Sequence, residues 1–403
     1  MHFTFRLSLL VFLFSSSVLF SSCSDTERSA SPAPEITGTE NLESPEELLQ
    51  KVEQAIEVAR QHYLASEKHS PWEIYHGMLA FRKEYEIKKD GKVVNALEWI
   101  SAGPTFENEP WFQKTEFGGR AHRYTKSNAF EGHKNQSLAI LAMADVPLDH
   151  QFMTPDGPIT VADIVADAQK EIQENEEVTW SLWGLVHYLG PDAVWEDKKG
   201  EQWHMEDLVY MQNATLSNES ACGGTHALFA LSYARNTFQN SGQRLRSYWL
   251  EADQKIQKHI EEAKAMQNLD GSFSYDYFFQ KSASENFQER LETTGHTLEF
   301  LMMALPDDRL NEDWVRKAIS LLANDIINNK DEPVDYSALY HAIDGLVIYR
   351  NRMSPDRTAQ LGSRNFPAQD KTESTDKKRT DRKVLKPVVP PAVPELPELP
   401  AKP

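Results

Sequence analysis

The chain has 403 residues, with 61 acidic and 42 basic side chains that give a formal net charge of -19 at neutral pH. This acidity argues against nucleic acid or an anionic bilayer surface as the main partner, because both attract basic surfaces. Apolar residues make up 40% of the chain, which is enough for one large core.

The N-terminus predicts an export signal that ends at a lipid attachment site. Arg6 precedes an apolar run at 9–20, shorter than the roughly 20 residues that span a bilayer. The sequence Phe20-Ser21-Ser22-Cys23 resembles a bacterial lipobox, in which the signal peptide is cut before the cysteine. That resemblance implies a signal peptide at 1–22 and diacylglycerol and palmitate on Cys23.

Ser24 follows the cysteine in place of an inner-membrane retention aspartate, which favours the outer membrane. Cleavage elsewhere, or a short uncleaved anchor, is the alternative.

Two tails flank the predicted domain. Residues 23–43 are rich in Ser, Thr, Pro and Glu, and residues 354–403 run through a charged patch into a proline-rich end. Neither has enough apolar side chains to offset the entropy of ordering, so both are predicted to be disordered. The proline-rich end favours an extended spacer or a ligand for an aromatic groove. One domain, at 44–353, remains.

Helical periodicity dominates this domain, because apolar residues recur at intervals of three and four. Amphipathic helices are predicted at 44–69, 160–174, 205–214, 244–266 and 311–328. More uniformly apolar helices are predicted at 72–81, 133–144, 179–188, 225–234, 293–304 and 336–349. Helix N-caps are predicted at Ser44, Thr225, Thr293 and Asn311. Strand signals are weak, so the predicted fold is all-α, an (α/α)6 toroid of inner and outer helix pairs.

The segment 88–130 interrupts this alternation. Its only helical pattern lies near 95–100, and the rest is predicted to be a long aromatic loop that includes Trp111. Long loops in compact domains are often functional, and an aromatic loop can cover a cavity.

A histidine recurs at or near the start of each apolar helix. The six are His76, His133, His187, His226, His296 and His341. A toroid would gather them around one central mouth. Alternatively, all six could have a purely structural role, in which each ring forms a hydrogen bond with a backbone carbonyl group.

Two turns in the second half carry a family resemblance. The sequences Asn268-Leu269-Asp270-Gly271-Ser272-Phe273 and Gly223-Gly224-Thr225-His226-Ala227-Leu228 resemble turns of the terpenoid cyclase and protein prenyltransferase toroid superfamily. Thr294-Gly295-His296-Thr297 resembles the helix start that holds a zinc-binding histidine in prenyltransferases. The resemblance covers 210–350 and implies the toroid fold. The Asp-x-Asp-Asp and Asp-Asp-x-x-Asp motifs of the isoprenoid enzymes do not occur in this chain.

Two kinds of site fit these residues. Imidazoles with a thiolate suit zinc, and the predicted metal ligands are His226, His296 and Cys222. Without a metal, histidines and a carboxylate can act as acid and base on a sugar or ester. The predicted catalytic residues are His226, His296, Glu299 and His341. Because aromatic faces stack on sugar rings, the predicted ligand-binding residues are Trp111, Trp183, Tyr275 and Tyr277.

The sequence therefore predicts an exported, lipid-anchored toroid protein that binds or cleaves an extracytoplasmic glycan or other polymer. One alternative is a non-catalytic surface lipoprotein that serves as an interaction platform. Another is a zinc-dependent enzyme similar to prenyltransferases or cyclases.

Overall fold

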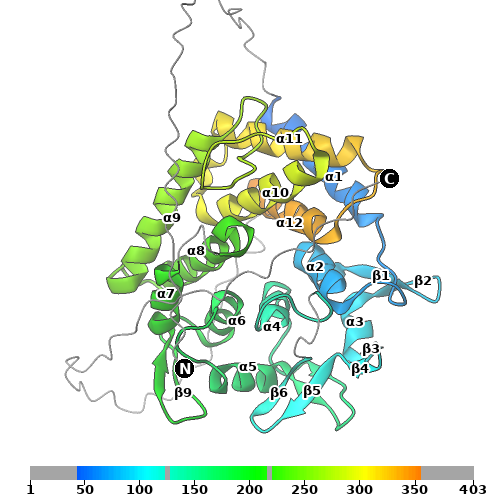
Figure 1. The fold of residues 1–403 in the computed structure, drawn as a ribbon, viewed down its shortest axis with the longest axis vertical. Coiled ribbons are helices and arrows are strands. Elements are labelled where there is room, and N and C mark those ends of the chain that lie inside the picture. The colour runs from blue at the N-terminus through cyan, green and yellow to red at the C-terminus, as the bar shows by residue number, and fades with distance from the viewer. Residues whose placement is uncertain (1–42, 123–127, 216–219, 355–403) are drawn as a thin grey trace, which may run out of the picture. The chain divides into compact units, whose positions relative to one another are not determined.

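The computed structural model describes residues 43–122, 128–215 and 220–354, and Figure 1 shows their fold. The predicted signal peptide, the lipid site at Cys23 and nearly all of both predicted tails lie outside these ranges. Within them, no helix is both long and apolar enough to cross a membrane.

The described residues form twelve α-helices and a few short strands, which confirms the all-α class. The helices are α1 (Pro45–Arg60), α2 (Pro71–Phe81), α3 (Ala96–Ser101), α4 (Gln136–Met143), α5 (Val161–Lys170), α6 (Thr179–Leu189), α7 (Met205–Ala214), α8 (Thr225–Asn240), α9 (Ser247–Met266), α10 (Phe287–Ala304), α11 (Asp313–Asn328) and α12 (Tyr336–Met353). Each predicted helix has a counterpart, because strong apolar periodicity identifies helices well and their ends less well.

Local capping explains where several helices begin. Ser44 caps α1 in a capping box with Glu47, as predicted, and Ser70 caps α2 in the same way. The other three predicted caps are wrong. Thr225 is the first residue of α8, Thr293 lies inside α10, and Asn311 precedes the cap of α11.

The early start of α10 explains the error at Thr293. The cap of this helix is Asn286, whose side chain accepts hydrogen bonds from the backbone N–H groups of Gln288 and Glu289. The polar turns that follow have no apolar stripe, so the periodicity of the sequence becomes visible only at Thr293.

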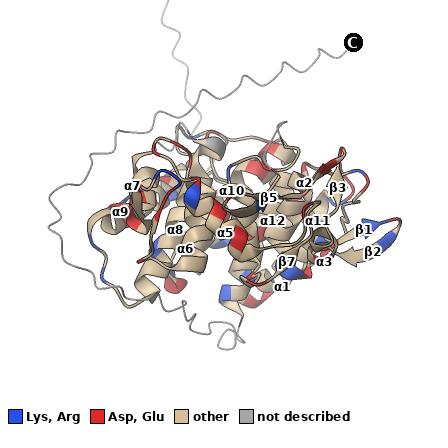
Figure 2. Cartoon of the chain, turned by 90° about the horizontal axis from the view of Figure 1, so that it is seen from below, with Lys and Arg blue, Asp and Glu red and all other residues tan. Residues whose placement is uncertain are grey.

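Five short antiparallel hairpins connect the helices in the described residues. They are β1 (Glu86–Lys89) with β2 (Lys92–Asn95), β3 (Thr105–Phe106) with β4 (Glu109–Pro110), β5 (Phe112–Thr115) with β6 (Gly118–Ala121), β7 (Gln151–Phe152) with β8 (Ile159–Thr160), and β9 (Val194–Glu196) with β10 (Gln202–His204). The first three occupy much of the segment predicted to be a loop. Strands of two to four residues are too short to show an alternating pattern. Lysines gather on the β1–β2 hairpin, whereas acidic residues are scattered over the other elements (Figure 2).

The even-numbered helices from α2 to α12 form a continuous series of contacts. Each contacts the next, and α12 returns to contact α2. In Figure 1 these six helices follow one another around the middle of the domain, with α1, α5, α7, α9 and α11 at its periphery. The six are buried along most of their length, whereas α1 and α11 each bury one stripe. The predicted difference between apolar and amphipathic helices is therefore seen in their burial.

Helices α10 and α12 approach each other closely because glycines lie where they cross. A Cβ atom on Gly295 would lie 2.8 Å from the Cβ atom of Ala342, and one on Gly345 would lie 3.1 Å from the backbone nitrogen of Glu299. Both distances are shorter than ordinary van der Waals contact. This close packing brings the side chains of Glu299 and His341 together.

The turn after α9 is held by Asp270, whose Oδ1 accepts hydrogen bonds from the backbone N–H and the hydroxyl of Ser272 at 3.0 and 2.8 Å. Replacing Asp270 with alanine is expected to lower the free energy of unfolding by about 1 kcal/mol, measured by urea denaturation. Asp270→Asn keeps the acceptor oxygen and should recover most of the loss. Equal stability of the alanine variant and the parent would contradict this role.

Candidate metal centre

Five of the six recurring histidines converge at one place among the apolar helices. The ring centroid of His226 lies 5.0 Å from that of His296 and 4.8 Å from that of His341. The rings of His296 and His341 are 4.2 Å apart. His76 lies 5.2 Å from His341, and His133 lies 5.6 Å from His226. We call these five side chains the histidine cluster.

The sixth histidine lies elsewhere. His187 is near the C-terminal end of α6, about 12 Å along the axis from its first residue. Its ring contacts the hydroxyl of Tyr233 at 2.8 Å and a carboxylate oxygen of Asp145 at 3.6 Å. The prediction that six histidines meet at one mouth is wrong for this residue, because an apolar run does not show at which end of the helix a polar side chain lies.

Within the cluster, only His226 lies at the beginning of its helix. His133 precedes α4, whereas His76, His296 and His341 lie more than one turn inside α2, α10 and α12. Of these three helices, only α10 begins well before its predicted start, at Phe287 rather than at 293, and the histidines still reach a common centre.

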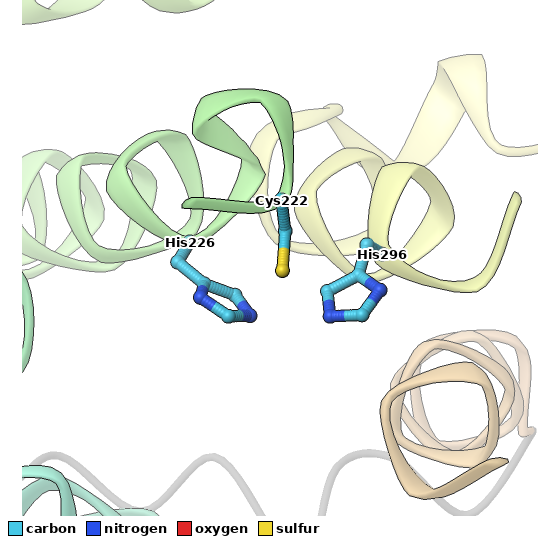
Figure 3. Close-up of side chains that lie close together, drawn as sticks. All are labelled: Cys222, His226 and His296. Carbon is cyan, nitrogen blue, oxygen red and sulfur yellow. The ribbon is translucent and has the colours of Figure 1, made fainter. Parts of the chain in front are cut away.

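A tight turn brings Cys222 to the histidine cluster. The 3₁₀ turn Ala221–Gly224 has left-handed backbone at three successive residues, with φ of 49° at Cys222, 60° at Gly223 and 83° at Gly224. Glycine adopts such angles readily, and this turn leads directly into α8. Figure 3 shows the sulfur of Cys222 directed between the rings of His226 and His296.

The three predicted metal ligands therefore lie together. One ligand atom from each of Cys222, His226 and His296 lies within 4.8 Å of the other two. Zinc binds thiolate and imidazole at about 2.0–2.3 Å, so small side-chain movements would bring all three atoms to one ion. Carboxylate-rich sites favour magnesium or calcium, whereas this set of one sulfur and two nitrogens favours zinc.

Hydrogen-bond acceptors at Nδ1 fix the orientation and the tautomer of three of these imidazole rings. Nδ1 of His296 lies 2.7 Å from the carbonyl oxygen of Glu292, and Nδ1 of His76 lies 2.6 Å from that of Trp72. Nδ1 of His341 lies 3.0 Å from both carboxylate oxygens of Glu299. A carbonyl or carboxylate at Nδ1 selects the tautomer with its lone pair on Nε2, as at the outer shell of metal sites.

Two buried histidines lack partners at the centre. Neither ring nitrogen of His226 has a hydrogen-bond partner among the described residues, and neither does Nε2 of His341. A buried polar atom without a partner costs about 1–3 kcal/mol. These two rings lie on α8 and α12, with their centroids 4.8 Å apart.

Burial sets the ionisation of these groups. It lowers the pKa of His296 and His76 to about 4, and lowers that of His226 well below its usual value. Neutral imidazoles are the form that binds metals. Burial also raises the pKa of the Cys222 thiol to about 12, so metal binding would have to displace its proton.

Two fully buried carboxylates lie behind His341. Glu299 contacts the ring of His341, and Asp344 accepts a hydrogen bond from the guanidinium of Arg82 at 2.5 Å. Burial raises the pKa of both acids, and the proximity of Asp344 raises that of Glu299 further. One guanidinium cannot balance two ionised carboxylates, and a divalent cation in the histidine cluster would supply positive charge nearby.

The structure changes the expected role of Glu299. The sequence pairs it with His296 on one face of a helix, whereas its carboxylate contacts His341 on the next helix of the series. Arg82 and Asp344 were not predicted. Asp344 is nevertheless detectable in the sequence as the only charged residue in the apolar run 338–349, which is a signal of a buried functional charge.

The four predicted ligand-binding aromatics fall into two groups. Trp111 is buried against Tyr75 and Trp99, and Trp183 is buried against Tyr233. Both indoles are buried in the core, and their role in ligand binding stays a prediction. Apolar core positions and apolar binding positions look alike in a sequence.

Tyr275 and Tyr277, by contrast, line a pocket of about 380 Å³ beside the turn that carries Cys222. Trp72 and Trp180 are two further aromatic side chains near the histidine cluster. They contact the cluster, with ring centroids 4.3 Å from His76 and 5.2 Å from His226.

Comparisons with known proteins give no independent identification. No protein-family model, no curated protein and no solved structure matches the chain.

Proposed function

We propose that the chain is an exported zinc enzyme in which Cys222, His226 and His296 bind the metal. The observation that carries this proposal is the convergence of the three ligand atoms within 4.8 Å, at a buried His226 whose ring nitrogens have no hydrogen-bond partner among the described residues. Three protein ligands leave a fourth position for water or substrate, as in catalytic zinc sites.

The proposed architecture is the (α/α)6 toroid of the terpenoid cyclase and prenyltransferase type. The circular series of contacts from α2 through α12 and back to α2 supports it, with the amphipathic helices at the periphery. In such a toroid the inner helices surround one centre, which would account for the gathering of histidines from four inner helices and from the segment just before α4.

The proposed chemistry is hydrolysis or group transfer on a metal-activated water or substrate. Zinc lowers the pKa of a bound water to about 7 and polarises a carbonyl group. His341 lies beside two of the ligands with its Nε2 free, so it can accept a hydrogen bond from a water at the fourth position. Glu299 would hold the ring of His341 in this orientation.

The substrate is proposed to be a small molecule or the end of a polymer. Four of the five clustered histidines, His76, His226, His296 and His341, are buried, and the neighbouring pocket of about 380 Å³ has the size of a small-molecule site. This favours an end group over an internal stretch of glycan. Export and lipid anchoring at Cys23 would place the activity in the cell envelope, with the outer membrane favoured.

The first test is the metal content of the full chain, purified without chelators and measured by inductively coupled plasma mass spectrometry. About one zinc per chain is expected. Cys222→Ser should lose the metal, and His187→Ala, which changes a histidine outside the cluster, should keep it. A parent protein without stoichiometric metal would overturn the proposal and leave the non-catalytic platform.

A further inference from the structure

The pocket beside the metal centre is a second feature with its own chemistry. Its lining includes Gly223, next to Cys222, and Glu292, one turn before His296 in α10. The rest of its wall is mostly the loop that follows α9. The lining residues used below are Gly223, Tyr275, Asp276, Tyr277, Phe279 and Glu292.

Aromatic rings form one side of this pocket. Phe279 is 73% exposed and Tyr275 is 43% exposed, although solvent exposure of large aromatic side chains is unfavourable. The ring of Tyr277 packs on Gly223, where a Cβ atom would lie 2.3 Å from the ring, and its buried hydroxyl has no partner among the described residues. Faces of such rings attract organic cations as well as apolar groups.

Carboxylates also line this pocket. Glu292 and Asp276 line the pocket, and among the described residues of its lining there is no lysine or arginine. Glu292 is exposed to solvent and lies near the carboxylates of Asp335 and Glu289. A carboxylate among other acidic groups gains from a positively charged ligand.

Nearby basic groups are already engaged elsewhere. The guanidinium of Arg290 donates to both carboxylate oxygens of Asp325 at 2.7 and 2.8 Å. The ammonium of Lys281 donates to the carbonyl oxygen of Gln267 at 2.7 Å. These basic side chains therefore do not neutralise the carboxylates that line the pocket.

We propose that this pocket binds an alkylammonium group, with the aromatic faces of Tyr275 and Phe279 against its carbon atoms and Glu292 facing its charge. The cation site itself does not require a metal. Its further role, to bring an ammonium-bearing substrate to the metal centre, rests on the proposed function. An acidic protein also attracts cations over long range, which favours such a substrate class.

The test uses a matched pair of probes, choline and its uncharged isostere 3,3-dimethylbutan-1-ol, titrated into the full chain by isothermal calorimetry. Choline is expected to bind at least about tenfold more tightly than the isostere, since carboxylate and cation–π contacts act only on the charge. Glu292→Gln should weaken choline binding by about tenfold or more and leave isostere binding unchanged. Phe279→Ala should weaken choline binding, whereas Leu269→Ala, at a 91% exposed residue outside the lining, should not.

Equal binding of the two probes would overturn the cation assignment and favour a neutral ligand such as a sugar. No binding of either probe, or unchanged choline binding by Glu292→Gln, would also overturn it. The titration is repeated on Cys222→Ser, which keeps the pocket and should lose the metal. Choline binding by a parent chain that holds no zinc would refute only the metal proposal, and zinc without choline binding would refute only the cation site.

Discussion

Replacing His226 with leucine is expected to lower the affinity for zinc by more than about 100-fold, because even the loss of an outer-shell partner costs 10–100-fold. Competition with a chromophoric chelator measures this affinity. The parent protein should gain about 2.7 kcal/mol of stability at a free zinc concentration 100 times its Kd, and the variant should not.

The same variant distinguishes between two roles of His226, as a metal ligand and as a side chain that only stabilises the core. Both ring nitrogens of His226 are buried, and neither has a hydrogen-bond partner among the described residues. Leucine has a similar size and no polar side-chain atom, so this substitution removes the cost of burying two unpaired nitrogens. The metal-free variant should therefore be as stable as the metal-free parent or more stable. A loss of about 2 kcal/mol or more in urea denaturation would show that the ring stabilises the core by itself. His187→Leu is the matched control, because it should lose its hydrogen bond to Tyr233 and keep zinc binding.

The second large effect is expected at Arg82. Arg82→Met leaves Asp344 and Glu299 buried without their guanidinium, and breaking a buried ion pair from one side costs about 3–5 kcal/mol. Urea denaturation of the metal-free protein at neutral pH measures this loss. Arg350→Met is the matched control, since its side chain is 26% exposed, against 27% for Arg82, but its partner Glu53 is at the surface. The control should lose less than about 1 kcal/mol.

The loss of unfolding free energy in Arg82→Met should become smaller at acidic pH. Burial raises the pKa of Asp344 and Arg82 lowers it, so removing Arg82 raises the folded-state pKa further. The folded variant then binds more protons than its unfolded chain, and its stability relative to the parent rises as pH falls from neutral towards about 4, the usual carboxyl pKa. A deficit that stays constant over this range would show that Arg82 acts through packing alone.

The helices were predictable because each depends on residues close together in the chain. Burial of α2, α6 and α12 on most faces appears in the sequence as runs of mostly apolar residues. The hairpin β1–β2 escaped prediction because four-residue strands carry little pattern. Its turn, Asp90-Gly91 with positive φ at both residues, was the available signal.

The three candidate metal ligands were predictable as residues, but their geometry was not. Cys222 and His226 are four residues apart, but their convergence depends on the left-handed backbone of Gly223 and Gly224, which sequence alone leaves open. The contact between Arg82 and Asp344 joins residues 262 positions apart. Such a pair requires knowing which helices are neighbours, and apolar patterns do not specify that.

The packing of Tyr277 on Gly223 links two binding events. A ligand that shifts the Tyr277 ring also shifts the backbone next to Cys222, and a metal that fixes Cys222 restrains the surface on which that ring lies. Occupancy of the pocket and occupancy of the metal centre therefore share one free energy of coupling. By thermodynamic reciprocity, the factor by which a pocket ligand changes zinc affinity equals the factor by which zinc changes affinity for that ligand.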